Sequence, residues 1–383
     1  MKIIKFFFYI LFLPLWYLQY LIKRDDKVWV FGEWYGKTYS DNSKYFYEYV
    51  LKNSSDIKPY WITKNKKTYN ILRSQGKPCL MYNSFKAIHI SLIAGIVFIS
   101  CSKSDINKFF INGAKIIQFW HGSPIKKIGM DSYNYYDFLK NIFIKYFFPF
   151  NYEYNYYACF SSGKKFNKIY RSAFGLNDSQ VFLTGSPRND ILFSNKKSKY
   201  ISDLKNKSNL KKIILYLPTF RDSNPQLNYF QNFDSKKWND YLVHSDSIMI
   251  FKNHFAHKLN NLNFFSDRII YYNNTYNEDL NLVLNSSDVL ITDFSGVYFD
   301  FLLTKKPIIL FPYKYEEYIE KSRKLYFEYF NEFKNSICLN WSEILELLKN
   351  NKIKNVDFNY DYNKYRDANN SQRVYNKIYQ QIK

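Results

Sequence analysis

The sequence predicts an α/β fold of two lobes, each built on a parallel β-sheet. Short apolar runs, among them residues 90–99, 212–217, 249–251 and 289–291, alternate with longer helical or polar stretches, which is the pattern of βα units. The chain of 383 residues is long enough for two domains of ordinary size with separate cores. A Gly-x-Gly-x-x-Gly pattern is absent, so nothing indicates an NAD or FAD site.

Residues 1–24 are predicted to associate with a membrane. Phe6 to Ile22 form a nearly unbroken apolar and aromatic run with basic residues on both sides. The run is shorter than the ~20 residues of a typical spanning helix, and Pro14 and Gln19 interrupt it. We therefore expect an interfacial or monotopic anchor in preference to a crossing helix. The alternative interpretation is a buried first helix of the lobe that follows.

The first lobe, expected over residues 25–205, carries a histidine at a strand end. A short apolar run that begins at Lys115 leads into the turn Trp120–Pro124, which contains His121. Open α/β sheets bind ligands at the carboxyl ends of their strands. Histidine is the side chain best suited to accept a proton near neutral pH. A lone histidine on a turn is more often structural, but further strand-end motifs accompany His121.

Residues 138–150, shortly after His121, join bulky aromatic side chains to lysines in a basic amphipathic pattern. Two interpretations of this segment stay open. One is a helix that docks on a bilayer and presents the acceptor cleft to it. The other is a core helix between two strands.

The second lobe is expected over residues 206–365, after a polar, lysine-rich run at 194–209. Strand-end motifs occur in both lobes, at Gly185–Asp190, Pro218–Asp222, Lys252–His254 and Asp293–Gly296. Together with the turn at His121 they supply backbone N–H groups, hydroxyls, two arginines and a lysine. These groups are suited to holding a diphosphate at the edge of a sheet.

In this order, the motifs resemble those of the CDP-glycerol glycerophosphotransferases, the teichoic acid primases and polymerases with relatives that build capsules. The resemblance rests on Trp120–Pro124, Gly185–Asp190, Pro218–Asp222 and Asp288–Asp300, and it covers the chain from about Val28 to its C-terminus. The length resembles that of the short, primase-like members. The resemblance implies two Rossmann-like lobes in a glycosyltransferase-B arrangement. In that arrangement a C-terminal helix, here within residues 366–383 and capped near Asn370 or Ser371, returns to the first lobe.

The resemblance also implies roles for individual residues. His121 is expected to be the general base on the acceptor hydroxyl, and His254 to contact the donor phosphates and stabilise the leaving group. The family often has two adjacent serines where this chain has Ser295 and Gly296, so only a backbone N–H remains as donor at Gly296. The donor-binding residues implied by the resemblance are Gly122, Ser123, Pro124, Ile125, Arg188, Thr219, Phe220, Lys252, Asn253, Ser295, Gly296 and Asp300.

The residue types fit this chemistry without the resemblance. Transfer of a polyol phosphate needs a base near the acceptor alcohol, together with donors or positive charge on the leaving nucleotide. No Asp-x-Asp pair occurs, so we expect no metal and no cofactor, with cationic side chains and amides in place of Mg²⁺. His257 follows His254 by three residues, but no Cys or acidic residue accompanies them, which argues against zinc.

Three of the candidates also have plainer interpretations. Arg188 could form a local ion pair with Asp190, and Arg221 could form one with Asp222. Asp300 could be an acid on the surface of a helix. Each of these interpretations would remove the residue from a binding role.

The chain is strongly basic, with 55 Lys and Arg against 33 Asp and Glu and a net charge of +22. Such a charge suits nucleic acid, an anionic membrane or anionic substrates. The lysines are dispersed and no nucleic-acid-binding motif occurs, so we expect an anionic membrane surface as partner and no nucleic acid. Part of the excess of Lys, Asn, Ile, Tyr and Phe is explained by AT-rich codons. Four widely spaced cysteines, Cys79, Cys101, Cys159 and Cys338, predict a reducing, cytosolic compartment.

We therefore expect a peripheral or monotopic enzyme on the cytoplasmic face of a bacterial membrane. It would move glycerol phosphate, or a related polyol phosphate, from CDP-glycerol or another CDP-polyol such as CDP-ribitol. The acceptor would be a hydroxyl of a lipid-linked saccharide or of a growing teichoic acid or capsule polymer, and CMP would leave. Two alternatives are a glycosyltransferase of the same two-lobed fold that uses a UDP- or GDP-sugar, and a membrane-bound lectin-like protein that needs neither histidine.

Overall fold

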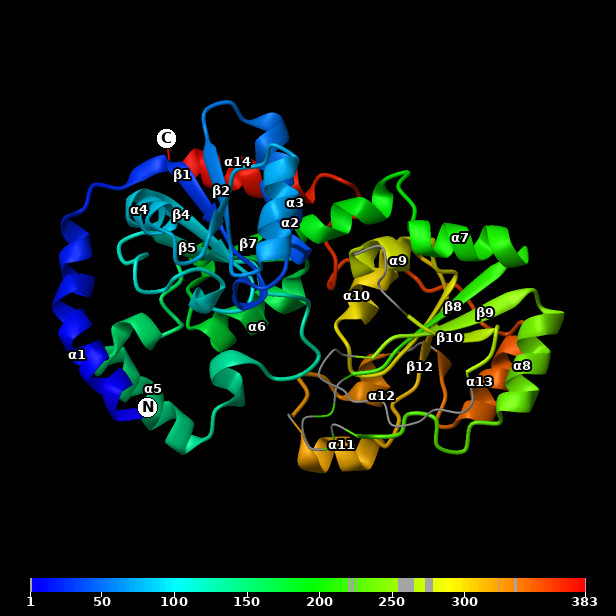
Figure 1. The fold of residues 1–383 in the computed structure, drawn as a ribbon. Helices are drawn as coiled ribbons and strands as arrows, with labels where there is room; N and C mark the ends of the chain where they lie inside the picture. Colours follow the sequence, from blue (N-terminus) through cyan, green and yellow to red (C-terminus); the bar gives the residue numbers. More distant parts are fainter. Residues whose placement is uncertain are drawn as a thin grey trace. The chain divides into compact units, whose positions relative to one another are not determined.

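The chain forms two compact units, each with one parallel sheet. The computed structural model describes residues 2–219, 221, 224, 226–253, 265–272, 278–322, 324–333 and 336–382. The first unit contains the chain up to His121, residues 129–190 and residues 367–383, and the second contains residues 122–128 and 191–366. Figure 1 shows helices packed around both sheets. The predicted α/β class with two parallel sheets is confirmed.

The first unit contains a seven-stranded sheet in the order β3-β2-β1-β4-β5-β6-β7. All its described strand pairs are parallel. All six residues of β4 are buried, as expected for a strand that is covered on both faces. The strands are β1 (Asp25–Phe31), β2 (Lys58–Thr63), β3 (Cys79–Met81), β4 (Ala94–Ile99), β5 (Lys115–Gln118), β6 (Ala158–Ser161) and β7 (Val181–Leu183).

The helices of the first unit lie between these strands and at the two ends of the chain. They are α1 (Lys2–Leu18), α2 (Asp41–Asn53), α3 (Lys66–Ser74), α4 (Phe85–Ile93), α5 (Tyr135–Phe147), α6 (Lys164–Phe174) and α14 (Asn370–Ile382). Side-chain caps begin several of them: Asn65 accepts from the first turn of α3, and Asn134 forms a capping box with Asp137 at α5.

The second unit contains a six-stranded parallel sheet in the order β10-β9-β8-β11-β12-β13. Its strands are β8 (Lys212–Leu217), β9 (Ser247–Phe251), β10 (Ile269–Tyr271), β11 (Val289–Thr292), β12 (Ile308–Leu310) and β13 (Ser336–Ile337). Its helices are α7 (Lys199–Ser208), α8 (Ser235–His244), α9 (Leu280–Ser286), α10 (Val297–Leu302), α11 (Tyr315–Lys321), α12 (Tyr329–Glu332) and α13 (Trp341–Lys349).

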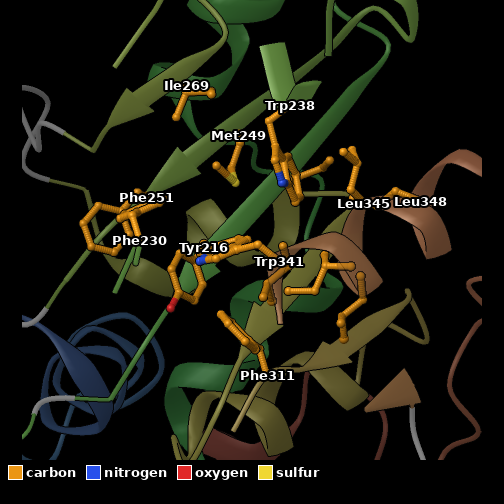
Figure 2. Packing of buried hydrophobic residues seen from close by; sticks show 14 of the residues in the cluster. Tyr216, Phe230, Trp238, Met249, Phe251, Ile269, Phe311, Trp341, Leu345 and Leu348 are labelled. Atoms are coloured by element: carbon orange, nitrogen blue, oxygen red, sulfur yellow. The ribbon is translucent and has the colours of Figure 1, made fainter. Parts of the chain in front are cut away.

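An aromatic core fills one side of the second sheet. Figure 2 shows Tyr216 and Phe251 from the strands together with Phe230 and Trp341. The rings of Phe230 and Trp341 stack with their centroids 5.2 Å apart, and Trp238 meets Trp341 edge-on. Such contacts add to the free energy of burying each ring. They pack β8 and β9 into the core directly before the turns that follow these two strands.

Both sheets have a point where the strand order reverses, between β1 and β4 in the first and between β8 and β11 in the second. Ligands of open α/β sheets bind outside the carboxyl ends of the strands at such a point. Glu33 and Ser100 follow β1 and β4, and Thr219 and Asp293 follow β8 and β11. These are therefore the positions at which a site is expected.

The strand-end motifs follow β5, β7, β8, β9 and β11, as predicted. The apolar run at 90–99 is divided, which the sequence did not indicate: its first four residues end α4, and the strand begins at Ala94. The hydroxyl of Ser84 caps α4 by accepting from the N–H of Ala87. A Cβ at Gly95 would lie 2.6 Å from the Cα of Asp26. The start of β4 can therefore approach β1 this closely only with glycine at position 95.

The division of the chain differs from the predicted boundary at 205/206. The first unit ends at Asp190, and helix α7 occupies the polar run that was expected to separate the lobes. Residues 122–128 belong to the second unit although they directly follow His121. The C-terminal helix belongs to the first unit, where the carboxylate of Asp190 accepts the N–H groups of Asn370 and Ser371 at 2.8 and 2.9 Å.

The two segments predicted to meet a membrane are largely exposed helices. Trp16 of α1 and Gln19 in the turn after it are buried, whereas Leu11 is 75% exposed and Leu21 is 81% exposed. The alternative of a buried first helix therefore holds only for the end of α1 among the side chains that the structure describes. No residue of α5 is buried, so the alternative of a core helix at 138–150 is wrong. Within the described residues, the structure has no helix that combines the length and the hydropathy needed to span a bilayer.

Candidate active site

His121 lies on the turn after β5, and its ring is held in a defined orientation. Its Nδ1 atom is 3.2 Å from the carbonyl oxygen of Ser100 and 3.6 Å from the Sγ atom of Cys101. Because a carbonyl only accepts, we assign the hydrogen to Nδ1, which puts the lone pair of the neutral ring on Nε2. The indoles of Trp34 and Trp120 flank the ring, with centroids 5.1 and 4.1 Å away. The surroundings thus favour the tautomer that accepts a proton at Nε2.

The backbone on both sides of His121 is unusual. Trp120 has φ of 57° and Gly122 has φ of 146°. A positive φ is uncommon for a bulky residue such as tryptophan. Residues in such regions persist only where the surrounding contacts hold them, and they are frequent at functional turns.

Arg188 lies in the first unit, close to His121, and is almost fully buried. Its Nη1 atom donates to both carboxylate oxygens of Asp41 at 3.0 Å and to the carbonyl oxygen of His121 at 2.8 Å. The alternative of a local ion pair with Asp190 is wrong, because the carboxylate of Asp190 accepts hydrogen bonds from the start of α14. Arg188 therefore contacts the backbone of the candidate base directly.

Two fully buried acids lie behind this turn. Asp105 accepts the backbone N–H groups of Tyr35, Ser100 and Cys101 at 2.7 to 2.9 Å. The hydroxyl of Ser100 donates to Glu33. Burial raises the pKa of Glu33 well above its usual value, and the charges of Asp41 and Asp105 raise it further. Burial also raises the pKa of Asp105, in spite of its backbone hydrogen bonds.

Sequence reasoning missed Glu33, Asp41, Asn42, Ser100 and Asp105. A usable signal existed for Glu33, since an acid beside Gly32 directly after the apolar run of β1 is a strand-end motif like the others. A Cβ at Gly32 would lie 2.5 Å from the carbonyl oxygen of Asp105, so the close approach of these turns depends on that glycine. No comparable signal marks Asp41 and Asn42, which begin a helix.

In the second unit, the candidate donor residues gather at three neighbouring strand ends, those of β9, β8 and β11. Thr219, after β8, is buried, and its Oγ1 has no hydrogen-bond partner within the described residues. Lys252, after β9, has a pKa lowered by burial. Asn253 is buried beside it and accepts from the hydroxyl of Tyr271 at 2.7 Å. Hydroxyl, ammonium and amide groups thus converge on one edge of the sheet.

Asp293 connects the turns at this edge of the sheet through buried hydrogen bonds and an ion pair. It accepts the N–H groups of Thr219 and Phe294 at 2.7 Å each and pairs with Arg221 at 2.8 Å. The guanidinium of Arg221 also lies over the rings of Phe294 and Tyr318, at 5.1 and 4.4 Å from their centroids. Arg221 thus has a buried carboxylate partner from the turn after β11, whereas Asp222, its alternative partner, lies outside the described residues.

The segment after His121 is built into the second unit. The N–H of Tyr326 donates to the carbonyl of Ile125 at 2.8 Å, and the N–H of Lys127 donates to that of Lys324, also at 2.8 Å. Ser123, Pro124 and Ile125 are buried, whereas Gly122 is half-buried. A Cβ at Gly296 would lie only 2.4 Å from the carbonyl oxygen of Ser123. The departure from two adjacent serines thus coincides with a close backbone approach that only glycine permits.

The remaining candidates differ in how they are placed. The Oγ of Ser295 accepts from the N–H of Val297 at 3.4 Å, at the start of α10. Asp300 on α10 is 4% exposed, so the interpretation as a surface acid is wrong. Phe220 and His254, and with them His257, lie outside the described residues. Among those described, no group of three or more His, Cys, Asp or Glu side chains could hold a metal ion.

The sequence profile of one protein family matches residues 15–380 of this chain. That family is described as CDP-glycerol:poly(glycerophosphate) glycerophosphotransferase. A teichoic acid glycerol-phosphate transferase of Staphylococcus aureus is 28% identical over 338 residues, which is 83% of this chain and 82% of the relative. A teichoic acid glycerol-phosphate primase of Bacillus subtilis is 31% identical over 269 residues, 69% of this chain and 68% of the relative.

Longer relatives and a solved structure agree with this match. A teichoic acid poly(glycerol phosphate) polymerase of Bacillus subtilis is 27% identical over 88% of this chain, and the chain spans 45% of that polymerase. The solved structure of the wall teichoic acid polymerase TagF has a TM-score of 0.73 at 24% identity, covering 94% of this chain and 90% of that chain. The latter similarity concerns the fold.

Proposed function

Since this chain belongs to the CDP-glycerol:poly(glycerophosphate) glycerophosphotransferase family, we propose that it transfers glycerol phosphate, or a related polyol phosphate, from the CDP ester to an acceptor hydroxyl with His121 as the general base. The acceptor is a lipid-linked saccharide or a growing teichoic acid or capsule polymer. The observation that carries the proposal is the hydrogen bond from Nδ1 of His121 to the carbonyl of Ser100. It leaves Nε2 as the proton-accepting atom at the carboxyl edge of the sheet.

The reaction balances with one proton transfer. The acceptor oxygen forms a bond to the phosphorus that carries the polyol, while the bond from that phosphorus to the oxygen of CMP breaks. Nε2 of His121 takes the proton of the acceptor hydroxyl, and CMP leaves with the negative charge. A base within hydrogen-bond reach of the hydroxyl typically contributes about 10² to 10⁴-fold to the rate.

The donor is assigned to the strand ends of the second unit. Lys252 supplies positive charge, and Thr219 supplies a hydroxyl that has no hydrogen-bond partner among the described residues; both follow buried strands. Groups of this kind stabilise the charge that develops on the leaving nucleotide. His254 follows directly in the sequence and, by the family resemblance, contacts the donor phosphates. The further donor contacts proposed are Gly122, Ser123, Pro124, Ile125, Arg188, Phe220, Asn253, Ser295, Gly296 and Asp300.

The test is release of CMP from CDP-glycerol by the full chain, with and without a lipid-linked or synthetic saccharide acceptor. We expect acceptor-dependent release that falls by at least about 10²-fold in His121→Ala and in His254→Ala. His89→Ala and His244→Ala are matched controls, because these two histidines are exposed and belong to α4 and α8. Release of CMP from CDP-ribitol but not from CDP-glycerol would identify CDP-ribitol as the donor. Turnover only with a UDP- or GDP-sugar, or glycan binding with no turnover, would overturn the proposal.

We also propose that the protein works at the anionic, cytoplasmic surface of the membrane, to which α1 and α5 attach it. The exposed face of α5 carries Phe138, Phe143, Tyr146 and Phe147, interspersed with lysines. Tyr9 of α1 contacts Phe148 and Phe150, which follow α5, with centroids 5.8 and 4.9 Å away. The two helices are therefore linked, and aromatic groups with basic neighbours favour an anionic interface.

Flotation of the full chain with phosphatidylglycerol or phosphatidylcholine vesicles tests this attachment. We expect binding to the anionic vesicles, weakened at least about 10-fold by the double substitution Phe143→Ser and Phe147→Ser. Phe85→Ser is the matched control, because Phe85 is 93% exposed but lies on α4. An equal loss of vesicle binding in Phe85→Ser would contradict attachment through α5. Equal binding to both kinds of vesicle would contradict a preference for an anionic surface. Deletion of residues 1–24 then reports what α1 adds.

A further inference from the structure

The backbone around His121 has an unfavourable conformation that contacts with other parts of the chain must hold in place. The positive φ of Trp120 and the φ of 146° at Gly122 place two consecutive peptide groups, one on each side of His121, in an unusual arrangement. Positive φ at a non-glycine residue costs on the order of 1 kcal/mol or more and is kept only by surrounding contacts. The contacts that reach these two peptide groups therefore decide where the imidazole lies.

Asn42 contacts the first of the two peptide groups. Its Nδ2 donates to the carbonyl oxygen of Trp120 at 2.9 Å, and its Oδ1 accepts the N–H of Arg188 at 3.1 Å. The side chain is 2% exposed. One buried amide thus ties the turn after β5 to the turn after β7, with a donor and an acceptor both satisfied.

Asp41 acts on the second peptide group through Arg188. Its two carboxylate oxygens each lie 3.0 Å from Nη1 of Arg188, which in turn donates to the carbonyl oxygen of His121 at 2.8 Å. The side chains of the pair are 8% and 15% exposed. Charge-assisted hydrogen bonds in such partly dry surroundings are stronger than neutral ones. The carboxylate therefore orients the guanidinium toward the His121 carbonyl.

We propose that Asp41 and Asn42, the first two residues of α2, are positioning residues for the general base. Together they fix the carbonyl groups on both sides of His121, one directly and one through Arg188, while Ser100 fixes the ring. This inference rests on the proposed function of His121. It gives Arg188 a role in holding the base as well as its proposed contact with the donor.

The role predicts a specific kinetic pattern. A displacement of about 1 Å at a reacting group costs on the order of 10²-fold in rate. We expect Asn42→Ala and Asp41→Ala to lower kcat by about that factor, and Asn42→Ala to leave the Kd for CDP-glycerol within about 2-fold. Asn42→Asp keeps the acceptor for Arg188 but loses the donor for Trp120, so its kcat should also fall. Asp41→Glu should recover part of the rate lost in Asp41→Ala.

Ser40→Ala is the matched control, because Ser40 is the N-cap residue of α2 but its side chain makes no capping hydrogen bond. A loss of kcat in Ser40→Ala equal to that in Asn42→Ala would mean that any disturbance of the helix start has the same effect, and would overturn the inference. A double-mutant cycle of Asp41→Asn and Arg188→Gln should show strong coupling, because Asp41 acts through Arg188. Additive losses in that cycle would equally contradict the chain of contacts.

A readout that does not need turnover separates this inference from the proposed function. Nitrogen-15 NMR of the histidine rings in the full chain reports the tautomer and the pH midpoint of His121, identified by its loss in His121→Asn. We expect the signal to move toward mixed tautomers in Asp41→Ala and Asn42→Ala, and to stay unchanged in Ser40→Ala. Unchanged signals would overturn the positioning role even if the wild type transfers no glycerol phosphate. A shifted signal in a wild type without turnover would leave the positioning role standing and the proposed function wrong.

Discussion

The two units bury acidic side chains behind their strand ends in different ways. In the first unit, Glu33 and Asp105 are fully buried, and the hydrogen bonds described above come from neutral groups, the hydroxyl of Ser100 and three backbone N–H groups. In the second unit, Asp293 is 1% exposed and pairs with the guanidinium of Arg221. The two strand-end acids of the first unit thus lie among neutral donors, whereas the strand-end acid of the second unit pairs with a buried cation, as Asp41 at the start of α2 does with Arg188.

The difference has physical consequences. A buried acid among neutral donors can respond to its surroundings by binding a proton, and the raised pKa of Glu33 and of Asp105 shows this tendency. A buried ion pair has no such adjustment, because removal of one partner leaves an uncompensated charge. We therefore infer that Glu33 and Asp105, in the unit that holds His121, contribute to the response to pH. The donor-side strand ends depend instead on one ion pair for their integrity.

The largest expected effect comes from breaking that ion pair. Asp293→Ala leaves Arg221 buried without its carboxylate and also removes the acceptor for the N–H groups of Thr219 and Phe294. We expect the free energy of unfolding to fall by about 3–5 kcal/mol. Denaturant unfolding of the full chain, followed by tryptophan fluorescence, measures the change.

An exposed pair in the same unit provides the control. Lys211 and Asp246 lie 2.7 Å apart, but both side chains are largely exposed to solvent. Lys211→Ala should therefore leave the unfolding transition almost unchanged. The double substitution Arg221→Met with Asp293→Leu should be more stable than Asp293→Ala alone, since no charge is left buried. If Asp293→Ala unfolds like Lys211→Ala, the ion pair does not hold the edge.

A smaller effect is expected from filling the gap at Gly296. Its φ of −60° is ordinary, so any cost of Gly296→Ser comes from the contact with the carbonyl of Ser123 and not from the backbone conformation. Overpacking of this kind costs about 1–3 kcal/mol, and we expect a raised KM for CDP-glycerol because the segment at 122–125 is displaced. Gly76→Ala is the comparison: nothing lies within 4 Å of its added Cβ, but its φ is +71°. A stable Gly296→Ser variant with an unchanged KM would show that the segment moves freely.

The structural features that depend on residues adjacent in the sequence were predicted well. Apolar runs that end in Gly, Pro or polar residues mark β5, β7, β8, β9 and β11, because a strand covered on both faces must be apolar and must stop at a turn. The position of His121 on such a turn followed directly. The sequence did not predict where α4 ends and β4 begins, because the start of β4 at Ala94 depends on the approach of Gly95 to Asp26 in a neighbouring strand.

What depends on distant contacts was not predictable from the sequence. Arg188 pairs with Asp41, 147 residues away, whereas Asp190 is only two residues away. The local pairing was the simpler expectation, but Asp190 is needed at the start of α14, 180 residues further along. The boundary at 205/206 failed for a related reason, since a polar run can be a solvated helix such as α7 as well as a linker.

Asp190 offers the smallest effect and the sharpest test of where the pH response lies. Burial raises its pKa to about 6, in spite of hydrogen bonds from Ser371 and Asn370. An unfolded aspartate has a pKa of about 3.9, so between about pH 4 and 6 the folded protein holds a proton that the unfolded chain releases. The free energy of unfolding then falls as pH rises through this window. We expect the decline to be smaller by about 1–2 kcal/mol in Asp190→Asn than in the wild type, measured by denaturant unfolding at each pH. Asp367 provides a contrast of opposite sign, because its hydrogen bonds with Arg373 lower its pKa, so its contribution is lost only as pH falls below about 4. If Asp190→Asn keeps the wild-type slope between pH 4 and 6, the response must come from other groups.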